Sequence, residues 1–202
     1  MPSSSLPPAA DVVPRLDVRD PDLWLKALGW IVVVGSALVI LTFSFGRDQG
    51  IYALVADGIL DGKMPYRDVW DFKPPGIFLV YALAELSFGK NMMAPRLLEV
   101  LALFGGVACM RRITGVLLDN RTVGLVGGAL AALIHAQMDF WHTGQPETFG
   151  AFFTLLGLAW TLEEPRRRRE LFLIAIGASF GFSALAKPPL RGRAPASRAF
   201  PA

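Results

Sequence analysis

An uncharged run near the N-terminus constrains the fold of this chain more than any other feature. Residues 27–45, ALGWIVVVGSALVILTFSF, contain no charged side chain. At about 1.5 Å per residue, a helix of this length crosses most of the roughly 30 Å hydrocarbon core of a bilayer. Hydrophobic residues make up 53% of the chain, more than a soluble domain usually carries. The sequence therefore predicts an integral membrane protein that begins with an uncleaved signal anchor.

Four further apolar segments predict an all-α bundle of about five transmembrane helices. They cover residues 94–110, 122–138, 146–162 and 171–186. The densest basic cluster, residues 166–169, belongs in the cytoplasm under the positive-inside rule. Counting back along the chain then places the N-terminus in the cytoplasm and residues 46–94 outside, together with Glu147. We expect a multi-pass protein of the inner or plasma membrane.

Residues 77–88 leave an alternative open, because a crossing there would exchange the sides of Asp48 and the N-terminus. Lys and Arg counts barely separate the two topologies. As a helix these twelve residues reach only about 18 Å, and Glu85 lies among them, so we expect an interfacial helix. Residues 51–60 are expected to form a second, amphipathic interfacial helix. Its apolar face comprises Ile51, Leu54, Val55 and Ile59.

Both ends of the chain differ in composition from the apolar segments. Residues 1–23 are rich in Pro, Ser and charge, which predicts a disordered cytoplasmic leader. Residues 189–202 are rich in Arg, Ala and Pro and are also expected to be disordered. The basic residues flank apolar segments, which is typical of topology signals and argues against nucleic acid as a partner. Cys109 is the only cysteine, so a disulfide framework is excluded.

The loop after the first span carries two ordered patterns. D-x-G-x-Y begins at Asp48, and G-x-x-P-Y-x-D-x-W-D-x-K-P-P ends at Pro75. This combination resembles the GT-C membrane glycosyltransferases, in particular the protein-mannosyltransferase and aminoarabinose-transferase branch, over residues 24–188. The resemblance implies a GT-C-like module that transfers a sugar from a polyprenyl-phosphate donor on the non-cytoplasmic face. The acceptor would be a hydroxyl of a glycan, lipid or protein.

The resemblance also implies roles for individual residues. An external acid of the family matches Asp48, a Lys-Pro-Pro lysine matches Lys73, and a second external acid matches Glu147. A carboxylate within hydrogen-bond reach of an attacking hydroxyl can act as a general base, so Asp48 and Glu147 are the catalytic candidates. A lysine or arginine stabilises a leaving phosphate best where water is reduced, which makes Lys73 the main phosphate ligand. Arg47 and Arg67 are further candidates for this role.

Other polar and aromatic residues of the loop are candidate substrate contacts, with plainer alternatives beside them. Tyr52, Tyr66 and Trp70 would pack against a sugar or the lipid, or would serve as interfacial anchors. Asp68 and Asp71 would bind an acceptor or a divalent metal, or belong to a solvated face. No spacing specifies a metal site, and no cofactor is implied.

The family's members continue with more helices, and apolar spacing stops after Ala186. We therefore expect an N-terminal fragment that does not complete the donor pocket alone. The alternative to an enzyme is a non-catalytic helix bundle, such as an accessory subunit or a transporter component. A transporter should carry polar residues near the middle of its spans, whereas here polarity is concentrated in the loops.

Overall fold

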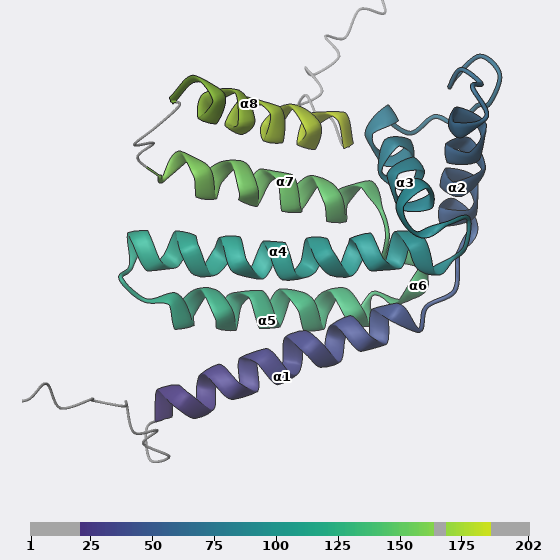
Figure 1. The fold of residues 1–202 in the computed structure, drawn as a ribbon. Helices are drawn as coiled ribbons and strands as arrows, with labels where there is room; N and C mark the ends of the chain where they lie inside the picture. Colours follow the sequence, from purple (N-terminus) through teal and green to yellow (C-terminus); the bar gives the residue numbers. More distant parts are fainter. Residues whose placement is uncertain (1–20, 164–168, 187–202) are drawn as a thin grey trace, which may run out of the picture.

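A computed structural model describes residues 21–163 and 169–186, and the regular elements in these ranges are α-helices (Figure 1). The prediction of an all-α protein is thus confirmed. The helices are α1 (Pro21–Leu41), α2 (Arg47–Leu60), α3 (Pro75–Phe88), α4 (Met93–Leu117), α5 (Arg121–Gln137), α6 (Asp139–His142), α7 (Pro146–Thr161) and α8 (Arg169–Ala186). Residues 21–23 were predicted as part of a disordered leader, but they form the first turn of α1. The rest of that leader, the basic residues 166–168 and the tail 189–202 lie outside the described residues.

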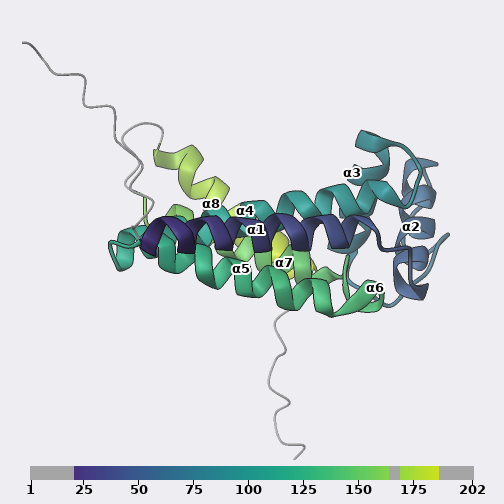
Figure 2. The same cartoon turned by 90° about the horizontal axis from the view of Figure 1, so that it is seen from below.

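Five helices, α1, α4, α5, α7 and α8, run side by side along one axis (Figures 1 and 2). α4 is central and packs against α5 and α7, while α1 covers α5 and α8 covers α7. In the described ranges, α1, α4 and α8 are long and apolar enough to cross a membrane. α5 and α7, with 17 and 16 residues, are shorter. Five spans therefore remain a prediction, whereas three candidate spans are present.

The α4–α5 contact is close because small residues line it. A Cβ built on Gly124 would lie 2.4 Å from the main-chain oxygen of Met110 and 2.6 Å from Cα of Arg111. Only a glycine lets the two backbones approach this closely. α4 also continues to Leu117, beyond the predicted end at residue 110.

The two ends of the bundle differ in character. At one end, Arg112 Nε lies 2.6 Å from Glu163 Oε1, and the Thr122 hydroxyl donates to Asp22 Oδ1 at 2.9 Å. The opposite end carries α2, α3 and α6 (Figures 1 and 2). Asp48 lies there, so Arg111 and Arg112 in the C-terminal half of α4 and the start of α2 are at opposite ends. The sides of the membrane on which the two ends lie stay a prediction.

α2 and α3 cross the end of the bundle and share a core with it. Eight of the fourteen residues of α3 are buried. Three of its exposed apolar side chains, Leu79, Leu83 and Leu86, form a stripe on the other side. The face of α2 that packs against the protein carries Tyr52 and Ala56, which are buried, while Leu54 of the predicted apolar face is 67% exposed. Packing against α3 selects this face.

Candidate functional site

A pocket of about 560 Å³ opens at the α2–α3 end of the bundle. It is lined by Arg47, Asp48, Lys73, Met138, Trp141, His142, Gln145 and Glu147. Four of these, the two cations and the two carboxylates, were predicted as site residues from distant parts of the sequence. The fold brings them together.

Asp48 lies in the first turn of α2, where the helix dipole favours a negative charge. Its carboxylate is partly exposed toward the pocket, and Oδ1 lies 3.7 Å from Arg47 Nε. The Arg47 side chain is largely exposed, so this loose contact leaves it able to turn to a ligand. The start of α2 thus supplies one acid and one mobile cation.

Lys73 reaches the pocket from the turn that precedes α3. The hydroxyl of Tyr66 donates to the main-chain oxygen of Lys73 at 2.8 Å, and Pro74 and Pro75 follow directly. The prolines restrict the backbone of the turn. Lys73 Nζ lies 5.3 Å from the centre of the Phe72 ring. The lysine is therefore placed on a restrained turn.

Glu147 is the second residue of α7 and follows Pro146 at the first helical position, where proline is favoured. The preceding residue, Gln145, is fixed by two hydrogen bonds. The Tyr52 hydroxyl donates to Gln145 Oε1 at 2.9 Å, and Gln145 Nε2 donates to the main-chain oxygen of Trp141 at 3.0 Å. α2 and the start of α7 are thereby tied together beneath the pocket.

The pKa of Tyr52 reflects the carboxylates that lie near its hydroxyl group. Its side chain is 1% exposed, and its pKa is raised, first by burial and then by the charges of Asp48, Asp71 and Glu147. Three acids therefore act on one phenol. Even so, no group of three His, Cys, Asp or Glu side chains that could hold a metal ion occurs among the described residues.

The remaining predicted residues lie outside the pocket lining. Arg67 and Asp68 pair with each other, with Arg67 Nη2 2.7 Å from Asp68 Oδ2, and both lie in the exposed loop before α3. Asp68 Oδ2 also accepts from the main-chain N–H of Met64 at 2.9 Å, which caps the loop. Trp70 is 71% exposed. Asp71 is buried, and its charge adds to the effect of burial in raising the pKa values of Tyr52 and Tyr66. Arg67, Asp68, Trp70 and Asp71 are therefore not among the residues that line the pocket with Asp48.

The sequence did not predict the pocket wall that the α5–α7 connection provides. Trp141 and His142 come from the four-residue helix α6. Asp139, which starts this helix, has a φ of +64°, a conformation that a non-glycine residue rarely adopts. The only signal for this wall in the sequence is an aromatic residue near an acid, in a segment predicted to be external.

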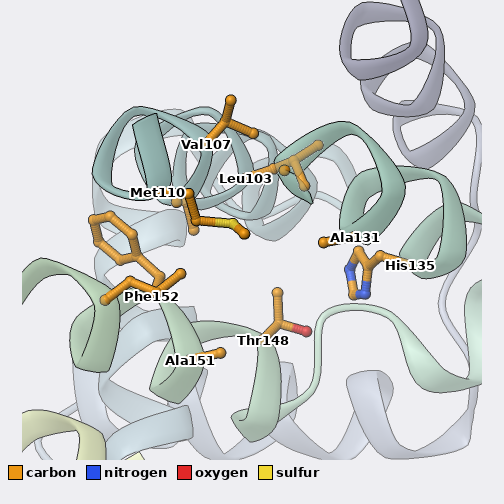
Figure 3. A pocket seen from close by; sticks show the side chains of 12 residues that line it. Leu103, Val107, Met110, Ala131, His135, Thr148, Ala151 and Phe152 are labelled. Carbon is orange, nitrogen blue, oxygen red and sulfur yellow. The ribbon is translucent and has the colours of Figure 1, made fainter. Parts of the chain in front are cut away.

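A buried network below the pocket was also not predicted. Arg96 and Glu99, in the first two turns of α4, are 1% and 0% exposed, and Arg96 Nη1 donates to Glu99 Oε2 at 2.8 Å. His135 Nε2 lies 2.7 Å from Glu99 Oε1. The His135 ring borders a cavity of about 180 Å³ between α4, α5 and α7, across from Thr148 (Figure 3). Two opposite charges three positions apart inside an apolar segment were the available signal.

Comparisons with known protein families, with curated proteins and with solved structures found no match.

Proposed function

We propose that this chain is a membrane glycosyltransferase module that transfers a sugar from a polyprenyl-phosphate donor to an acceptor hydroxyl. One observation carries the proposal: two carboxylates and two cations from α2, the α3 turn and α7 line one pocket at the end of an apolar bundle. A donor with a lipid tail, an anionic phosphate and a hydroxyl-rich sugar needs this combination of surfaces.

The proposed roles follow from the chemistry of each group. Asp48 accepts the proton of the attacking hydroxyl, and Glu147 orients the sugar or the acceptor from the opposite wall. Lys73 and Arg47 stabilise the charge that develops on the leaving phosphate, because charges act more strongly where water is reduced. Trp141 offers an aromatic surface for the apolar face of a sugar ring.

We further propose that all five long helices cross the membrane, with the pocket on the non-cytoplasmic face of the inner or plasma membrane. α5 and α7 would span about 25 Å each, and side chains at their ends can make up the difference by snorkelling. α2 and α3 would then lie at the headgroup level, with the stripe of Leu79, Leu83 and Leu86 toward lipid.

The test is a transfer assay with the full-length protein that contains these residues, in lipid vesicles that contain polyprenyl-phosphate-linked sugars. We expect Asp48→Asn to lower turnover by at least about 100-fold, the usual contribution of a general base. Lys73→Ala should lower it as well. Asp119→Asn at the other end of the bundle and Lys63→Ala on the exposed loop serve as controls and should keep full turnover. Full turnover in both pocket variants would remove these assignments.

Donor binding gives a second measurement that does not require turnover. Trp141 lines the pocket, so its fluorescence should change saturably when polyprenyl phosphate is added. Lys73→Ala should weaken this response, and the same lipid without phosphate should give none. A chain that neither transfers sugar nor responds to the phosphate lipid would refute the proposal.

Sidedness is tested with a single cysteine. Asp48→Cys, made in a Cys109→Ala background, should react with a membrane-impermeant thiol reagent only from the non-cytoplasmic side. Reaction only from the cytosolic side would overturn the proposed topology.

A further inference from the structure

The Arg96 side chain contacts both segments that lead into the two carboxylates of the pocket. Its Nη2 donates to the main-chain oxygen of Ser44 at 2.9 Å, four residues before Asp48. Its Nη1 donates to the hydroxyl of Thr143 at 2.8 Å, four residues before Glu147. One guanidinium therefore joins the α1–α2 linker to the α6–α7 connection.

Glu99 completes the link from the other side. Its Oε1 accepts from the main-chain N–H of Gly144 at 2.5 Å and contacts His135 Nε2, while Oε2 accepts from Arg96. Each oxygen thus has a donor, and the donors come from α4, α5 and the α6–α7 connection. Buried charges are stable only when they are paired and hydrogen-bonded in this way.

Side chains of α2 and α3 hold the same connection. Gln49 Nε2 donates to the main-chain oxygens of Phe140 at 2.5 Å and Thr143 at 2.7 Å, and the Tyr81 hydroxyl donates to that of Gly144 at 3.0 Å. Asp139, with its unusual conformation, begins the helix α6 that leads into this connection. Such a conformation persists only where the surroundings determine it.

We propose that Arg96 and Glu99 are positioning residues that fix Asp48 and Glu147 relative to each other. The guanidinium holds the segment before Asp48 with one arm and the segment before Glu147 with the other, and Glu99 locks the second segment through Gly144. The catalytic meaning of this geometry rests on the proposed function, whereas the geometric claim does not.

A purely structural role, in which the pair only neutralises buried charge, makes a different prediction. Arg96→Lys keeps the positive charge, but a single ammonium cannot hold Glu99, Thr143 and Ser44 as a planar fork does. If neutralisation were the whole role, Arg96→Lys would leave the pocket unchanged. If the pair positions the segments, this variant releases one of them.

The experiment measures the distance between spin labels on the two sides of the pocket in the full chain, with Cys109→Ala as background. One label is placed at Gly50→Cys, where a side chain meets open space, and the other at the exposed His142→Cys. We expect one narrow distance distribution in the parent and a clearly broader or shifted one in Arg96→Lys and Glu99→Gln. In Glu99→Gln, an amide NH₂ group replaces one carboxylate oxygen. This NH₂ group then faces a hydrogen-bond donor from which it cannot accept. Glu163→Gln, which breaks the ion pair at the opposite end, should leave the distribution unchanged.

Distributions in Arg96→Lys and Glu99→Gln that match the parent in both width and position would overturn the proposal. His135→Gln and His135→Leu form a milder pair in case Glu99→Gln fails to fold. The glutamine can still donate to Glu99 and should restore the parent distribution, while leucine should not. Equal distributions in this pair would count against Glu99 as the lock.

Turnover gives a second, separate readout. A misplacement of about 1 Å costs on the order of 100-fold in rate, so Arg96→Lys should lower kcat by about this factor and change the donor KM little. A chain without transferase activity but with the expected label distances would sink the proposed function and leave the positioning role standing. Intact transfer together with unchanged label distances in the variants would support the proposed function and overturn the positioning role.

Discussion

Glu85 provides the clearest energetic test of the structure, because it is a buried acid that faces another acid. It lies on α3 against Asp57 of α2, is 7% exposed, and its Oε2 has no hydrogen-bond partner among the described residues. Burial and the charge of Asp57 raise its pKa to about 7. The pKa of Asp57 is lowered, mainly by its hydrogen bond from Lys90, so Asp57 remains the charged partner.

The magnitude follows from the two pKa values of Glu85. Its ordinary value is 4.5 and its folded value is about 7, a difference that corresponds to at most about 3 kcal/mol. Because the folded value is the higher one, the protonated acid favours the folded chain. The contribution is complete below pH 4.5 and is lost as the pH rises through about 7. Water at the end of the bundle screens the charge, so we expect about 1–3 kcal/mol in practice.

Glu85→Gln keeps the shape of the side chain and removes the titration. In thermal unfolding in detergent, the variant should match the parent near pH 5 and exceed its free energy of unfolding at pH 8 by about 1–3 kcal/mol. Glu170→Gln, on the exposed first turn of α8, serves as the control and should retain the parent's pH dependence. If parent and Glu85→Gln lose stability in parallel between pH 5 and pH 8, the placement of Glu85 against Asp57 is wrong.

Three further predictions test the packing and the pocket. Tyr52→Phe leaves the buried oxygen of Gln145 without its donor and should cost about 1–3 kcal/mol of stability, measured by thermal unfolding. Gly124→Ala drives a methyl group into the backbone of α4 and should cost about 1–3 kcal/mol, whereas Gly35→Ala, which meets open space, should cost nothing measurable in the same assay. Trp141→Ala should weaken binding of a polyprenyl-phosphate sugar about tenfold, or about 1.4 kcal/mol, while Trp141→Phe should keep most of the affinity in a titration.

The sequence was informative wherever a property belongs to one segment. Apolar length predicts the α1 helix, and the charged patterns after it predict Asp48 and Lys73 as site residues, which the structure brings into the lining of one pocket. Where the outcome depends on a neighbouring helix, the prediction differed. α4 runs past residue 110 because its arginines find partners there: Arg111 lies 5.4 Å from the Trp30 ring, and Arg112 pairs with Glu163.

The pocket residues show more clearly that the sequence alone does not predict contacts between helices. Gln145 and Trp141 have no distinctive sequence pattern, and only the contact with Tyr52 and the turn at Asp139 bring them to the site. Hydrophobic periodicity likewise places Leu54 on the apolar face of α2, but it does not reveal that Tyr52 and Ala56 become buried against the protein. These residues become visible only when the tertiary contacts are known.

The position of the buried charges bears on which function the bundle serves. A transporter needs polar groups near the middle of its spans, on the path of its substrate. Arg96 and Glu99 instead occupy the first two turns of α4, at the pocket end, and their hydrogen bonds are to segments of that end. A rigid site at one face of the bundle gains from such a network, since preorganised groups need no rearrangement when charge develops on a substrate. The placement of this charge therefore favours chemistry at a membrane surface over a path through the bundle.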